Sequence, residues 1–75
     1  MHAINHSALP FVGQRIRDLR VNSLRMTQAE FAFKVDMQLS YIIDVEKGMR
    51  NISLLSLIEM AKVLRVGVAE LLPPI

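Results

Sequence analysis

Hydrophobic and polar positions between residues 27 and 48 follow two short helical runs. Thr27 and Glu30 have the S/T-x-x-E spacing of a capping box, which predicts that a helix begins here. Polar residues from Asp36 interrupt the pattern before a second short run follows. Two helices of about two turns each with so short a connection predict a helix-turn-helix unit. The apolar residues expected to hold the two helices together are Phe31, Ala32, Val35, Met37, Ile42 and Val45.

The pattern outside this unit predicts further helices and no strand. A first amphipathic run begins at residue 7 or 10 and ends at residue 21, with arginines on its polar face. Gly48 suits the end of the third helix, where a left-handed backbone is common. Ser53 is a good N-cap for a helix over residues 54–64, and a last short helix is expected over residues 68–72. We therefore expect an all-α fold, a compact five-helix bundle that contains a helix-turn-helix.

Length and composition describe a small globular domain. The 75 residues are enough for one domain, expected over residues 7–75 behind a flexible tail of residues 1–6. The chain is 52% hydrophobic and has no cysteine, so neither disulfides nor thiolate metal sites are available. No apolar run is long enough for a membrane span, and the N-terminus lacks a signal-peptide pattern, so we expect a cytoplasmic protein. His2 and His6 lie in the tail without a third ligand, so neither a metal nor a cofactor is predicted.

The placement of charge is more informative than its sum. The net charge is only +2, which is a weak indication of nucleic-acid binding by itself. Basic residues nevertheless flank the helix-turn-helix on both sides, at Arg15, Arg17, Arg20, Arg25, Lys47 and Arg50. A helix-turn-helix places its second helix in the major groove of DNA. The pattern therefore predicts a DNA-binding regulator.

The chain resembles the Xre family of helix-turn-helix proteins, also called Cro/C1-type, in the segments VGQRIRDLR, TQAEFAFKV, YIIDVEKGMRNISLLSLIEMAKVL and VAELL. The resemblance covers residues 11–72. The family includes small phage repressors and the controller proteins of restriction–modification systems. The resemblance implies a lambda-repressor-like five-helix bundle, commonly dimeric, that represses or activates transcription. Such a protein would act as a homodimer on an operator in double-stranded DNA.

Three features of the turns depart from the family pattern. The turn before the first motif helix, residues 22–25, has one residue more than is usual and lacks the usual glycine. Asp36 stands in the helix-turn-helix turn where the family has glycine, and it tolerates a left-handed backbone better than most residues do. Gln38 replaces the usual Ser or Thr cap of the recognition helix and is a poorer cap. We expect these departures to preserve the fold.

Phosphate contacts are expected at two places, because helix N-termini attract anions. One is the start of the first motif helix, and the other is the loop that precedes the fourth helix. The resemblance gives Gln28 a hydrogen bond to a backbone phosphate. Gln28, Lys47 and Arg50 have the alternative role of ordinary solvated residues. The phosphate-contacting residues expected from these arguments are Thr27, Gln28, Lys47, Arg50 and Asn51.

The second motif helix is expected to carry both a structural and a reading role. The resemblance implies that Arg20 and Glu46 form a partly buried ion pair that holds this helix and touches no base. On the exposed face, Leu39 can contact a thymine methyl, and Asp44 can accept from cytosine N4. No Arg, Lys or Asn lies there, which predicts modest specificity that depends partly on DNA shape. The expected base-reading residues are Gln38, Leu39, Ser40, Tyr41 and Asp44, and each has solvation or phosphate contact as its alternative role.

Apolar residues outside the expected core indicate further contacts. Phe33, Ile43 and Leu55 fall where the family is usually polar, either as scattered surface residues or as a docking patch. The resemblance places Phe33 on the face that contacts RNA polymerase in activating members, although an acidic residue is typical there. The apolar C-terminus predicts a homodimer able to match a palindromic operator. Its expected interface residues are Val66, Val68, Leu71, Leu72 and Ile75, and one of the two adjacent leucines should face the core.

These observations favour a transcriptional regulator over other classes of protein. No catalytic triad, phosphate-binding glycine loop or HExxH motif is present, so enzymatic activity is not expected. The favoured function is a sequence-specific, dimeric regulator, either a restriction–modification controller or a phage-like repressor. The alternative is a protein-binding module, such as an antitoxin whose main partner is a toxin protein.

Overall fold

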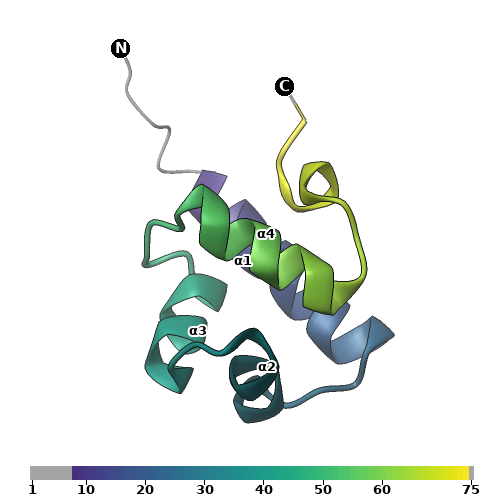
Figure 1. Ribbon diagram of the computed structural model, residues 1–75. Coiled ribbons are helices and arrows are strands. Elements are labelled where there is room, and N and C mark those ends of the chain that lie inside the picture. The colour runs from purple at the N-terminus through teal and green to yellow at the C-terminus, as the bar shows by residue number, and fades with distance from the viewer. Residues whose placement is uncertain (1–7, 75) are drawn as a thin grey trace.

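Four α-helices and one 3-10 turn make up the computed structural model, which describes residues 8–74 (Figure 1). Helices α1, Ala8–Asp18, and α4, Leu54–Leu64, occupy the upper part of Figure 1, where α4 lies in front of α1. Helices α2, Gln28–Val35, and α3, Leu39–Glu46, lie below them, and α3 forms one edge. The 3-10 turn η2, Val68–Leu71, follows α4 and contacts both α1 and α4. This arrangement confirms the expected all-α helix-turn-helix fold.

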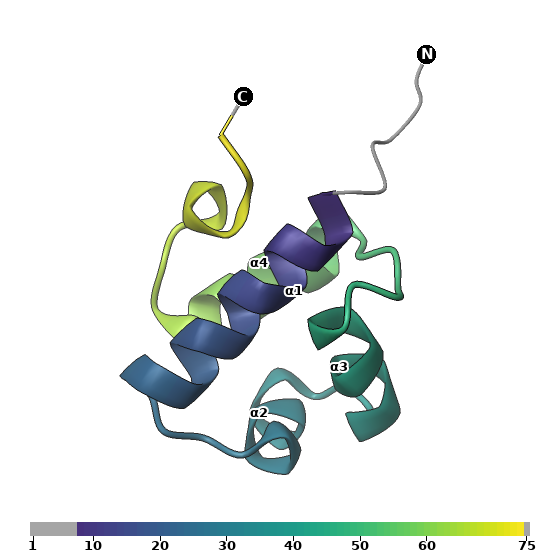
Figure 2. The same ribbon diagram turned by 180° about the vertical axis from the view of Figure 1, so that it is seen from behind.

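The first helix ends in a π-helical turn, η1, which covers Leu19–Ser23 (Figure 2). The amide of Leu24 donates to the carbonyl of Leu19, five residues earlier, over 3.1 Å. A π turn holds one more residue than an α turn, so it accommodates the longer connection seen in the sequence. Arg25 then takes a left-handed backbone with φ of 54°, in the turn where the family usually has glycine.

Helix α2 begins at the capping box that the sequence predicts. The amide of Glu30 donates to the Thr27 hydroxyl over 3.0 Å, and the Thr27 amide donates to the Glu30 carboxylate over 2.8 Å. The Thr27 backbone N–H, followed by the Thr27 side chain, lowers the pKa of the exposed Glu30 carboxyl. Asp36 ends α2 with φ of 57°, so it adopts the left-handed turn despite its side chain. Gln38 precedes α3 without a side-chain cap hydrogen bond, as expected for a poor cap.

One hydrophobic core joins all the helices. Phe31, Ile16, Ile42 and Met60 are fully buried, and Leu71 of η2 closes the core from the C-terminal side. The remaining buried apolar residues are Val12, Ala32, Val35, Val45, Leu57, Ala61 and Leu64. Burying each large aliphatic or aromatic side chain is worth about 1.5–3 kcal/mol, so this core can hold a short chain together. It also fixes α3 against both α1 and α2.

One detail of the expected fold requires correction. The fifth element is a 3-10 turn that ends at Leu71, because Leu72 takes an extended backbone with ψ of 149° before Pro73 and Pro74. Within residues 8–74, the bundle therefore has four α-helices, the π turn η1 and a 3-10 turn. The tail expected over residues 1–6 lies outside the described residues, and so do Ser7 and Ile75 at the domain's expected bounds. No helix among residues 8–74 combines the length and hydropathy that crossing a membrane requires.

Candidate nucleic-acid interface

Helix α3 exposes its first turn to solvent and buries the face that packs on the core. Ile42 and Val45 are buried, as the sequence periodicity predicts. Gln38, Leu39 and Ser40 are exposed at the first turn of the helix. Helix α3 lies at the edge of the molecule in both views (Figures 1 and 2), so this turn can enter a groove. The expected base-reading residues therefore lie on an accessible surface, with Tyr41 and Asp44 half-buried beside it.

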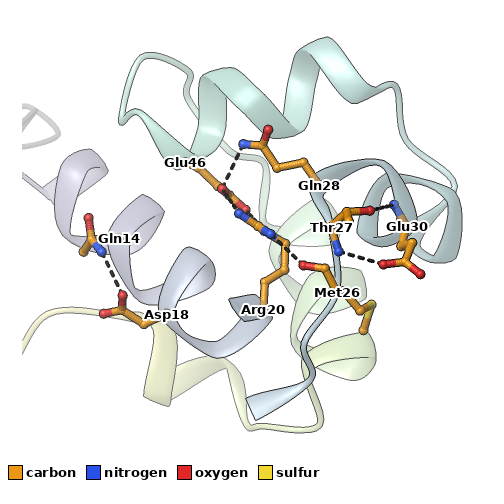
Figure 3. Close-up of polar contacts among 8 residues, drawn as sticks. All are labelled: Gln14, Asp18, Arg20, Met26, Thr27, Gln28, Glu30 and Glu46. Carbon is orange, nitrogen blue, oxygen red and sulfur yellow. Dashed lines mark hydrogen bonds and ion pairs between the residues drawn. The ribbon is translucent and has the colours of Figure 1, made fainter. Parts of the chain in front are cut away.

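The end of α3 is held by a buried ion pair (Figure 3). Arg20 donates from Nε to Glu46 Oε2 over 2.6 Å and from Nη2 to Oε1 over 2.9 Å. Its third bond runs from Nη1 to the carbonyl of Met26 over 2.7 Å. The side chains are only 8% and 3% exposed. A planar guanidinium can make two parallel bonds to a carboxylate, so the pair fixes orientation as well as distance.

Gln28 joins the same network from the first turn of α2. Its side-chain amide donates to Glu46 Oε1 over 3.0 Å, and the residue is half-buried. The sequence assigned Gln28 to phosphate binding and did not predict this bond to Glu46. An amide nitrogen carries two hydrogens, so one N–H remains for a phosphate when the other is bonded to Glu46. Gln28 therefore links the start of α2 to the end of α3 (Figure 3).

The other phosphate candidates lie at the start of α2 and directly after α3. Thr27, Lys47 and Asn51 are exposed, and Thr27 accepts the capping bond through its hydroxyl. Arg50 is exposed, and its guanidinium carbon lies 5.0 Å from the centre of the Tyr41 ring. A guanidinium at this distance is attracted to the face of an aromatic ring. The stack thus brings a phosphate candidate and a base-reading candidate together, a contact that their sequence separation did not indicate.

Two glycines allow α1 to approach the end of α3. A Cβ on Gly13 would lie 2.2 Å from the carbonyl oxygen of Val45, far inside any real contact. Gly48 has φ of 73°, and a Cβ there would lie 2.7 Å from Pro10 Cα. Gly48 was expected as a helix cap, whereas Gly13 was missed. A glycine inside the amphipathic run VGQRIRDLR was the available signal, because such a glycine usually has a packing reason.

The expected dimer residues do not share one environment. Leu71 is fully buried in the core, so its assignment to a dimer interface is wrong. Leu72 is 41% exposed, and Val66 and Val68 are half-buried against the core. Ile75 lies outside the described residues. Phe33 and Leu55 are exposed, and Ile43 is half-buried. Within residues 8–74, no group of three or more His, Cys, Asp or Glu side chains is placed to hold a metal ion.

Comparison with known proteins agrees with this arrangement. The HTH_3 helix-turn-helix family model matches residues 16–71, which include the ion pair and all of α2, α3 and α4. The chain belongs to this family. Its Xre-type character follows from the same match, so the resemblance found in the sequence is confirmed.

Three relatives indicate the branch of the family. Control protein C.BamHI of Bacillus amyloliquefaciens is 38% identical over 60 residues, which cover 80% of this chain and 74% of that protein. The restriction-modification controller C.AhdI of Aeromonas hydrophila has a TM-score of 0.79 and 36% identity, covering 84% of this chain and 94% of its own. The biofilm regulator SinR, solved in complex with DNA, has a TM-score of 0.75 and 31% identity, and the match covers 80% of this chain and 95% of the SinR chain. The chain is thus a helix-turn-helix transcription regulator related to controller proteins.

Proposed function

We propose that the protein is a homodimeric transcriptional regulator of a restriction–modification system, and that it inserts α3 into the major groove of its operator. The observation that carries this proposal is the exposed first turn of α3, held in place by the buried pair between Arg20 and Glu46. A helix that reads bases needs free side chains at its N-terminal turn and a rigid attachment behind them. The similarity to C.BamHI and C.AhdI supports the type of regulator.

Affinity would come mainly from the sugar-phosphate backbone. These contacts would come from the exposed residues Thr27, Lys47, Arg50 and Asn51 and from the second N–H of Gln28, at the start of α2 and directly after α3. Such contacts set the register of the protein on the duplex but carry no sequence information. The sequence would be read by Gln38, Leu39, Ser40, Tyr41 and Asp44.

Selection of bound duplexes from a random pool tests the proposed function. We expect an enriched site with two related half-sites, because a two-fold dimer matches a palindrome. For a controller, that site should occur upstream of the genes for the associated restriction system. Ser40→Ala should change the enriched bases without changing the fold, because Ser40 is exposed. A pool that shows no enrichment would contradict the proposal and favour a protein partner, such as a toxin.

A further inference from the structure

Helix α3 has an exposed leucine and contains no lysine or arginine. Leu39 is 42% exposed, whereas the other apolar residues of α3 are buried or half-buried. Leu39 is also outside the buried core cluster, so stability does not require an apolar residue at this position. It lies between exposed Gln38 and Ser40, at the turn that a recognition helix brings to the base edges.

The reading face offers few ways to recognise a G·C pair. Bidentate bonds from Arg or Lys to guanine are the commonest specific contact in the major groove. Helix α3 has the sequence LSYIIDVE and contains neither residue. Leu39 can make only apolar contacts, and the apolar group at the floor of the major groove is the 5-methyl group of a pyrimidine. Gln38 is suited to adenine through two hydrogen bonds.

We propose that Leu39 reads the 5-methyl group of a pyrimidine in each half-site of the operator. In ordinary DNA this group belongs to thymine, and in modified DNA 5-methylcytosine presents the same group. Thymine is the favoured source, because the neighbouring Gln38 is suited to adenine and both residues would then recognise A·T pairs. The inference rests on the proposed function and adds the identity of the group that α3 recognises.

Methyl-group replacement in the selected duplex tests this contact. Deoxyuridine replaces each thymine in turn, which removes the methyl group and leaves the base-pairing edge intact. At one position in each half-site, we expect the affinity of the unmodified protein to fall about fourfold, the value of burying one methyl group. Replacement in both half-sites together should weaken binding about fifteenfold. A second series replaces cytosine by 5-methylcytosine and identifies the source of the methyl group if thymine is not the base that is read.

Protein variants assign the effect to Leu39. Leu39→Ala should bind the thymine and deoxyuridine duplexes equally, and Leu39→Met should retain much of the discrimination. Val21→Ala shortens another exposed apolar side chain, on the π turn. This variant should distinguish the thymine duplex from the deoxyuridine duplex as well as the unmodified protein does. Circular dichroism of each variant checks that the fold is intact.

Two results would overturn the inference while the proposed function stands. One is a selected duplex whose binding changes at no position in either series. The other is discrimination by Leu39→Ala as strong as that of the unmodified protein, which would assign the methyl contact to another residue. A pool without enrichment would instead contradict the proposed function itself.

Discussion

Arg20 and Glu46 are charged residues that the fold keeps almost completely buried. Each guanidinium nitrogen has a hydrogen-bond acceptor, in the Glu46 carboxylate or the Met26 carbonyl. Removing one partner of such a pair leaves an uncompensated buried charge, which costs about 3–5 kcal/mol. We therefore expect Arg20→Ala to lower the free energy of unfolding by about this amount and Tm by more than about 10 °C. Thermal melts followed by circular dichroism measure the change.

Ser40 provides the matched control for this prediction, because it is exposed on α3 and makes none of these bonds. Ser40→Ala should leave Tm nearly unchanged. Under DNA titration, Arg20→Ala should lose affinity only to the extent that it loses folded protein. A stable Arg20→Ala protein that fails to bind DNA would show that Arg20 has a role in binding beyond stability, either by orienting α3 or by contacting DNA.

Gly13 is the residue at which backbone packing leaves no space for a side chain. Alanine is normally the better helix former by about 1 kcal/mol, so Gly13→Ala would stabilise an unconstrained helix. Here the new Cβ would meet the Val45 carbonyl at 2.2 Å, and overpacking of this kind costs about 1–3 kcal/mol or more. We expect Gly13→Ala to lower Tm and to weaken DNA binding by displacing α3.

Gly67 is the control for Gly13, because a Cβ there would be no closer than 3.8 Å to the Glu70 carboxylate. Gly67→Ala should change Tm little in the same melts. Equal effects of the two substitutions would contradict the packing argument. Gly13 lies inside α1 and Gly67 precedes η2, and the close approach of the Val45 carbonyl is what distinguishes them in the structure.

At the scale of the elements, helical periodicity and caps predicted most boundaries. Ser53 accepts a hydrogen bond from the Ser56 amide at the start of α4, and that helix covers the expected residues. Periodicity could not reveal the π turn at Leu19–Ser23, because an apolar pattern does not report which carbonyl each backbone amide bonds to. The Gln28 bond to Glu46 was missed for a similar reason, since it depends on how α2 and α3 are oriented.

The capping box of α2 should make stability depend on pH. Folding lowers the pKa of Glu30 below its ordinary value of 4.5, chiefly through the Thr27 backbone N–H. The charged carboxylate therefore stabilises the folded state above pH 4.5, and this contribution is lost as pH falls through the lowered pKa. We expect Glu30→Gln to have a lower Tm than the unmodified protein at neutral pH, and the difference to shrink on acidification. A difference in Tm that stays constant with pH would contradict this linkage.

At the scale of the whole molecule, the C-terminal turn divides its two leucines between the inside and the outside. The sequence predicted this division but could not assign it, because adjacent residues on a short helix differ by only about 100°. Leu71 is fully buried and Leu72 is 41% exposed. The exposed leucine and the half-buried Val66 and Val68 remain the surface that we propose for the dimer.

Charging this surface should separate the dimer from the fold. We expect Leu72→Glu to yield a folded monomer that binds the operator far more weakly, because only one half-site can then be held at a time. Sedimentation gives the mass and circular dichroism gives the helicity. Leu55→Glu changes an exposed leucine on α4 and should leave the mass unchanged. An unmodified protein that sediments as a monomer at tens of micromolar would contradict the proposed dimer.

Binding to duplex DNA as a function of salt tests the central claim most directly. If the dimer neutralises about four to eight phosphates, log K should fall linearly with log salt at a slope of about −0.9 for each contact. The selected operator should stay tighter than a scrambled duplex at every salt concentration, because α3 adds sequence-dependent contacts. We predict strong salt dependence together with tighter binding of the selected operator than of the scrambled duplex. A flat line, or the absence of binding at low salt, would contradict the claim that the protein regulates transcription by binding DNA.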